Sequence, residues 1–106
     1  MLTIPLTQNP SQTLTTNLAG QICQINVYQK FYGVFVDLYV SNLPIIIGVI
    51  AQNQNRIVRY KYLGFQGDLF FFDSQGTDDP TFDGLGDRWI LNYITQDELA
   101  TLGLAA

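Results

Sequence analysis

The segment T-D-D-P-T-F-D-G-L-G-D-R-W, residues 77–89, holds the side chains of this sequence that could most readily do chemistry. It contains four aspartates, although charged residues make up only 13% of the 106-residue chain. Clustered carboxylates can bind a divalent cation, act as a general acid and base, or cap the backbone amides of a turn. The spacing of the four aspartates decides among these chemistries.

Neither a metal site nor a catalytic pair fits this spacing. A calcium loop of the EF-hand type needs alternating oxygen ligands and a bidentate glutamate at its end, and the segment has no glutamate. Zinc is disfavoured because the chain has no histidine and a single cysteine. Acid–base catalysis needs two carboxylates held so that the pKa of one is raised, and the pattern gives no such pair. We therefore predict no metal, cofactor or catalytic residue, with calcium in an irregular loop as the open alternative.

Turn chemistry explains the same residues better. Aspartate side chains accept hydrogen bonds from nearby backbone amides, proline fixes φ, and glycine permits positive φ. We predict a structural turn whose shape depends on five residues: Asp79, Pro80, Asp83, Gly84 and Gly86.

The other reactive or charged residues do not suggest an enzyme. Cys23 lies in the alternating run I-C-Q-I-N-V, which indicates a core residue rather than a thiolate nucleophile. The net charge of −4 argues against nucleic-acid binding, which needs clustered cations. Arg56, Arg59 and Lys61 are the only cations that cluster, and they form either a solvated strand edge or a docking patch for an acidic neighbour.

Period-two alternation of apolar and polar residues dominates the chain and predicts strands to position these groups. In residues 21–30 and 34–40 one face is apolar and the other polar, and the short link between them predicts a hairpin with Gly33 supplying the unusual backbone angles. Five further strands are predicted at 13–18, 45–51, 57–63, 69–73 and 88–95. The capping-box pattern Thr95 to Glu98 predicts a short helix over 96–102, ended by Gly103. The fold class is therefore all-β, as one domain over 1–106: a small antiparallel sandwich or barrel of about seven strands with a short C-terminal helix.

Three apolar runs break the alternation: I-I-I-G-V-I, L-F-F-F and W-I-L-N-Y-I. A two-layer domain buries only one face of each strand, so either local loops or a neighbouring subunit must cover the other face. The low charge and 47% apolar content favour the neighbouring subunit, with Phe70, Phe71 and Phe72 as candidate contacts. No apolar run approaches the about 20 residues of a membrane helix, so no membrane segment is expected.

Several short motifs, in order along nearly the whole chain, carry a resemblance to a known family. They are I-P-L-T followed by N-P-S-Q-T, the Gly20–Gln21 step into an alternating strand, V-D-L-Y at 36–39, and D-P-T-F-D-G-L-G at 79–86 before a tyrosine-bearing strand. In these the sequence resembles the small baseplate plug proteins of contractile-tailed bacteriophages, and the D-P-T-x-D-x-L-G element is the most specific of them.

The resemblance implies a noncatalytic virion component, placed centrally in the tail baseplate near the hub and tube. The N-terminal residues show no positively charged region followed by a long apolar stretch, so we expect synthesis in the cytoplasm, here that of the host. The resemblance also implies several copies, forming a homo-oligomer within a ring, with other baseplate, hub and tube proteins as partners. A different class stays open beside it: a free-standing binding module for a glycan or peptide, in which Trp89, Tyr28 and Tyr39 would form a stacking surface.

Overall fold

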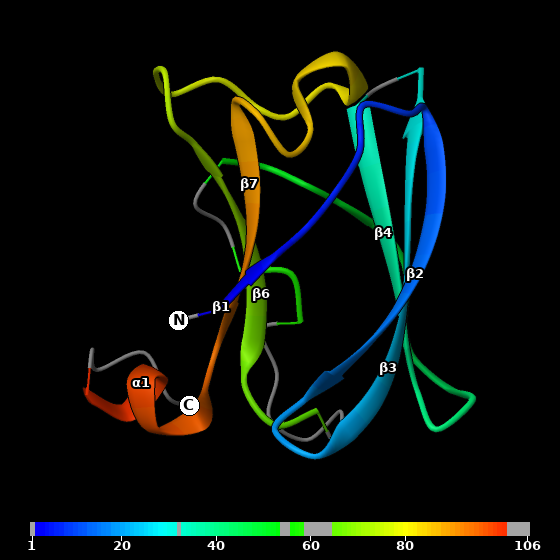
Figure 1. Cartoon of the computed structure of the whole chain (residues 1–106), viewed down its shortest axis with the longest axis vertical. Helices are drawn as coiled ribbons and strands as arrows, with labels where there is room; N and C mark the ends of the chain where they lie inside the picture. The colour runs from blue at the N-terminus through cyan, green and yellow to red at the C-terminus, as the bar shows by residue number, and fades with distance from the viewer. Residues whose placement is uncertain (1, 32, 54–55, 59–64, 102–106) are drawn as a thin grey trace.

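A computed structural model describes residues 2–31, 33–53, 56–58 and 65–101 of the chain, and it forms a sandwich of two antiparallel sheets (Figure 1). The all-β prediction is confirmed, and among the described residues no strand pairing closes the two sheets into a barrel. The strands are β1 (Leu2–Ile4), β2 (Ser11–Leu18), β3 (Gln21–Lys30), β4 (Gly33–Val40), β5 (Leu43–Ile50), β6 (Asp68–Asp73) and β7 (Trp89–Ile94).

The larger sheet has the order β2-β3-β4-β5, in which each strand pairs with the next along the chain. The turn between β4 and β5 has Ser41 at φ 50° and Asn42 at φ 67°, the positive values that a two-residue type I′ turn requires. Gly33 has φ 140° at the start of β4, as the sequence predicted.

The smaller sheet has the order β1-β7-β6 and contains one strand that sequence analysis missed. β1 has three residues, and its register with β7 pairs Thr3 with Asn92 and Ile4 with Leu91. A strand of three residues is too short for an alternation pattern, so the sequence carried no signal for it. Figure 1 shows the chain passing from β1 across to β2, which links the two layers.

The core lies between the two sheets and comes from the alternating residues of both. Cys23, Ile25 and Val27 of β3 are fully buried, as are Leu69 and Phe71 of β6. Burial raises the pKa of the Cys23 thiol, which agrees with its assignment as a core residue rather than a thiolate.

The predicted strand over 57–63 is wrong where the structure describes it, because Ile57 and Val58 lie in a bend. The Ile57 amide donates to the Leu69 carbonyl at 2.8 Å, and the Val58 amide donates to the Asp68 carboxylate at 2.8 Å. A side-chain carboxylate thus takes the place of the next ladder bond and turns the chain away from β6. The rest of the predicted strand, 59–63, lies outside the described residues.

The C-terminal helix begins as predicted. α1 (Gln96–Thr101) follows Thr95, whose hydroxyl accepts the Glu98 amide at 3.2 Å while the Glu98 carboxylate accepts the Thr95 amide at 3.1 Å. This reciprocal pair is the capping box. Leu99 is buried, while the predicted end at Gly103 lies outside the described residues. No described helix has the length and apolar content needed to cross a membrane.

The two faces of β6 give opposite expectations for neighbouring phenylalanines. Phe71 is 0% exposed in the core, whereas Phe72 is 42% exposed on the other face. We expect Phe71→Ala to lower the free energy of unfolding by about 3–5 kcal/mol, and Phe72→Ala by well under half as much. Urea unfolding of the isolated protein measures both. Equal losses would mean that both faces of β6 are internal.

Candidate interaction surfaces

The outer face of the smaller sheet combines apolar residues of β6 and β7 with polar residues of β7 and β1. Phe70 pairs with Asn92 and Phe72 with Ile90, while Asn92 also pairs with Thr3. A bridge between Arg56 and Phe70 extends this row beyond β6. We call this surface the outer phenylalanine face, and it comprises Thr3, Arg56, Phe70, Phe72, Ile90 and Asn92.

The structure separates the residues that the sequence grouped as partner contacts. Phe70 is half-buried and Phe72 exposed on the outer phenylalanine face, but Phe71 points into the core and has no surface to offer a partner. Neighbouring residues of a strand point to opposite faces, so three consecutive phenylalanines cannot share one contact. Arg56 lies on the same face as Phe70, whereas Arg59 and Lys61 lie outside the described residues.

Asp68 is a buried carboxylate at the edge of the outer phenylalanine face. It is 2% exposed, and one carboxylate oxygen accepts the amides of Val58 at 2.8 Å and Leu69 at 2.7 Å. Its other oxygen lies 3.9 Å from Arg56 Nη1. A buried carboxylate is stable only when hydrogen-bonded or paired, and this one fastens the 56–58 segment against β6.

The acidic loop is organised around Arg88. Its Nε and Nη2 donate to the two carboxylate oxygens of Asp73, each at 2.8 Å, and Nη2 also donates to Asp78 at 3.0 Å. The guanidinium carbon lies 4.5 Å from the ring centre of Trp89, whose indole N–H donates to the Asp78 carbonyl at 3.0 Å. We call the bidentate pair the Asp73–Arg88 clamp. It joins the end of β6 to the residue that precedes β7.

Hydrogen bonds determine the charge state of the clamp. Asp73 is 2% exposed, and besides Arg88 it accepts the amides of Gln75 and Asp78, both at 2.9 Å. The Arg88 guanidinium is the main cause that holds the pKa of Asp73 far below its usual range, against the opposing effect of burial.

The residues predicted to shape the turn pack closely against other segments. A Cβ on Gly84 would lie 2.3 Å from the Trp89 ring, and one on Gly86 would lie 2.2 Å from the carbonyl oxygen of Leu6. Gly86 also has φ 79°, a conformation that favours glycine. These contacts bring the loop against β7 and against the segment that links the two sheets.

The other three predicted turn residues also lie in this structure. Pro80 is buried, Asp79 accepts the Asn53 amide at 3.0 Å, and Asp83 accepts a hydrogen bond from the Thr81 hydroxyl. A 3-10 turn, η2 (Phe82–Gly84), crosses the loop. Within the described residues, no three His, Cys, Asp or Glu side chains are grouped as a metal site requires.

The outer face of the larger sheet carries a polar network centred on Asp37. Asp37 accepts the Tyr28 hydroxyl at 2.8 Å, the Gly48 amide at 2.7 Å and the Asn26 amide group at 3.3 Å. Thr13 donates to Asn26 at 2.9 Å, so the network crosses the sheet from β2 to β5. Burial and then the hydrogen bond to Asp37 raise the pKa of Tyr28 to about 12.

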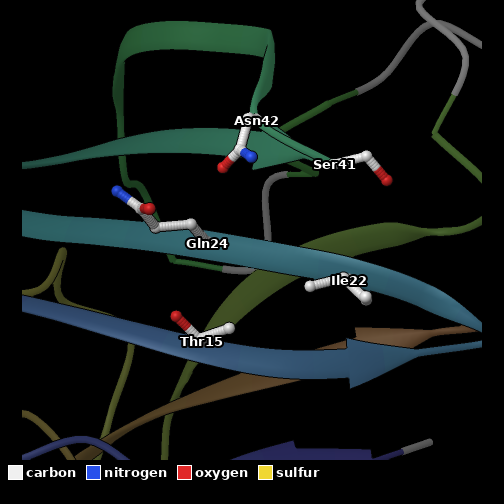
Figure 2. A pocket seen from close by; sticks show the side chains of 5 residues that line it. All are labelled: Thr15, Ile22, Gln24, Ser41 and Asn42. Atoms are coloured by element: carbon white, nitrogen blue, oxygen red, sulfur yellow. The ribbon is translucent and has the colours of Figure 1, made fainter.

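A pocket of about 310 Å³ opens near one end of this sheet, as Figure 2 shows. It is lined by Thr15, Ile22, Gln24, Ser41 and Asn42. None of these five side chains is charged, and no base in the lining could activate the hydroxyl of Thr15 or Ser41 as a nucleophile. The lining therefore offers only neutral hydrogen bonds.

The three rings considered as a stacking surface do not meet. Tyr28 and Tyr39 lie on the outer face of the larger sheet, whereas Trp89 is 6% exposed on the inner side of the smaller sheet. A stacking site for a glycan or peptide needs exposed ring faces, which Trp89 does not supply.

Comparison with known families gives a match over most of the chain. The family model described as cyanophage baseplate Pam3 plug gp18 matches residues 1–97 of the chain. Most of α1 therefore lies beyond the matched region. A comparison with curated proteins gave no match.

The clamp predicts a specific acid sensitivity. Because the pKa of Asp73 is lower in the folded than in the unfolded protein, the unfolded chain takes up this proton first as the pH falls below about 4. The stabilisation is thus complete at neutral pH and declines as the pH falls from about 4 toward the folded pKa. We expect Asp73→Asn to be less stable than wild type at pH 7 and to lose less stability between pH 5 and pH 3. Denaturant unfolding at both pH values measures this, with the exposed Asp87→Asn as control. A pH dependence unchanged by Asp73→Asn would contradict the assignment.

The packing of the loop predicts which substitutions matter. In Gly86→Ala the added methyl group would clash with the Leu6 carbonyl, and alanine is strained at the positive φ of this position. We therefore expect the free energy of unfolding to fall by roughly 2 kcal/mol or more. Pro80→Ala removes a buried ring and should also destabilise, whereas Asp78→Asn weakens one exposed ion pair worth about 0–1 kcal/mol. Thermal unfolding gives the order.

Calcium tests the same loop independently. An ion that binds only the folded state at 100 times its dissociation constant would add about 2.7 kcal/mol. We expect equal melting temperatures in excess calcium and in chelator. A large rise in melting temperature with calcium would show that the loop binds the ion.

Proposed function

The chain belongs to the cyanophage baseplate plug family, and from that membership we propose that it is a noncatalytic structural component at the centre of a contractile tail baseplate. In this role it is needed for assembly of the baseplate and tail. Several copies stand in a ring near the hub and tube and contact other baseplate proteins. The match over residues 1–97 is the observation that carries the proposal.

The outer phenylalanine face is the surface that best suits such a role. Phe72 is 42% exposed and neighbours Ile90 and the half-buried Phe70, so this side of the smaller sheet presents apolar area that a partner would remove from water. Arg56 adds a cation at its border, beside the buried Asp68. A surface with an apolar centre and a polar rim is the usual composition of a protein interface.

The catalytic alternative has little support in the described part of the chain. Cys23 is enclosed in the core, and the Asp73 carboxylate is committed to Arg88 and two backbone amides. A general base or nucleophile must reach a substrate with its reactive atom, and neither group does so.

Loss of the protein should arrest tail assembly. In an amber mutant grown in a nonsuppressing host, we expect filled heads with few or no attached tails, because a central component nucleates contacts that recur at every copy. Electron microscopy of lysates counts the tails, and plasmid-borne wild-type protein should restore them. Sheathed tails in normal number without the protein would reject the structural role.

Complementation of that mutant tests the surface itself. Phe72→Ser should fold with nearly wild-type stability and fail to restore tails, since it removes apolar area only from the outer phenylalanine face. Ile22→Ser is the matched control, because Ile22 is 61% exposed on the larger sheet. Full restoration by Phe72→Ser would show that this face does not contact a partner.

A further inference from the structure

The free edge of β2 lacks every device that usually protects a sheet edge. It has eight residues, S-Q-T-L-T-T-N-L, in unbroken register with β3, and it contains neither proline nor a charged side chain. Long, regular, uncharged edges are templates for pairing with another strand, which is why most proteins shorten, charge, kink or cover them. Within the described ranges, β2 is a terminal strand of its sheet.

The other three edges are protected in those ways. β5 contains Pro44, and its register with β4 shifts twice. β1 has only three residues, and β6 is flanked by bridges to Asn53 and Arg56. The contrast singles out β2 as the edge able to accept a strand.

One hydrogen bond shows which backbone groups of β2 face away from β3 and could bond to another strand. Gln29 N donates to Pro10 O at 2.7 Å, so Pro10 and Gln29 form a hydrogen-bonded pair one step before the pair Ser11 and Tyr28. Hydrogen-bonded pairs alternate in an antiparallel ladder, so the even-numbered residues of β2 bond to β3. The amides and carbonyls that face away from β3 belong to Ser11, Thr13, Thr15 and Asn17.

We propose that this edge pairs with the same edge of a second copy of the chain, antiparallel and across a two-fold axis at Leu14. Centring on Leu14 sets Thr13 opposite Thr15 and Ser11 opposite Asn17, so all four outward-facing residues meet outward-facing residues. Each such pair exchanges two backbone hydrogen bonds, and Thr opposite Thr is a favourable cross-strand pair. The two sheets join into one continuous sheet.

Charge favours a second copy in this orientation over a parallel one. The Ser11 end of β2 lies at the end of the sandwich that carries the acidic loop, and the Leu18 end lies at the opposite end (Figure 1). Antiparallel pairing therefore places the exposed aspartates of the two copies at opposite extremities, whereas parallel pairing would bring them together. The paired strands themselves carry no charge, so no like charges face each other across the contact.

Sedimentation velocity on the purified full-length chain tests the proposal. Because the contact has a small area, we expect a reversible monomer–dimer equilibrium between roughly 1 µM and 1 mM. Thr15→Pro removes an amide that β3 does not use, so it should leave the fold intact and weaken the dimer about tenfold or more. Thr15→Val keeps the amide and should dimerise like wild type. A wild-type chain that is monomeric throughout this range, or a folded Thr15→Pro variant that dimerises as well as Thr15→Val, would overturn the proposal.

Disulfide cross-linking tests the register between the two β2 strands and does not depend on the proline variant. Two Leu14 residues on the axis form a non-hydrogen-bonded pair with Cα atoms about 4.5 Å apart, within the range of a disulfide. Cys23 is 0% exposed, so we expect few disulfide-linked dimers from the native cysteine. Under mild oxidation, Leu14→Cys should give a disulfide-linked dimer, and the control Thr16→Cys should give little. Equal cross-linking of the two, or none by Leu14→Cys, would exclude this pairing.

Discussion

The Asp73–Arg88 clamp holds together the part of the chain that is least regular. β6 and β7 are neighbours in the smaller sheet, yet the segment that joins them is too long for a tight hairpin. The bidentate pair joins the two strands where this segment ends. Arg88 also lies against the Trp89 ring, and Gly84 has no side chain that would clash with that ring. Bidentate geometry fixes orientation as well as distance, so the clamp sets how the two ends of the loop lie relative to each other.

The same loop also contacts both layers of the sandwich. Gly86 approaches the Leu6 carbonyl in the segment between β1 and β2, and the Phe82 amide donates to the side chain of Gln29 at 3.1 Å. The acidic segment thus contacts both the connection between the layers and the β3–β4 hairpin. Asp78 pairs with Arg88, Asp79 accepts a backbone amide and Asp83 accepts a threonine hydroxyl, so three of the four carboxylates have local structural roles.

Sequence patterns predicted the regular part of this fold and missed what depends on long-range contacts. The alternation in β3 and β4, the turn at Gly33 and the capping box at Thr95 are local features, and they were confirmed. The strand expected at 57–63 failed at Ile57 and Val58 because Asp68, ten residues beyond Val58, takes its amide. Asp73 was missed as a clamp residue because its partner is fifteen residues away. The sequence left open which of the three phenylalanines faces the core, because equal residues in a row give no sign of it, and the structure places Phe71 there.

The uncharged edge of β2 has a consequence for the proposed assembly of the tail. Copies arranged around a tail axis are related by rotations about that axis, so a two-fold contact between neighbouring β2 edges has no place in such a ring. The proposed pair would therefore have to separate before its members enter the proposed ring. Pairing at β2 would cover the free strand edge while the protein is abundant, and dilution or a stronger competing contact would release single copies.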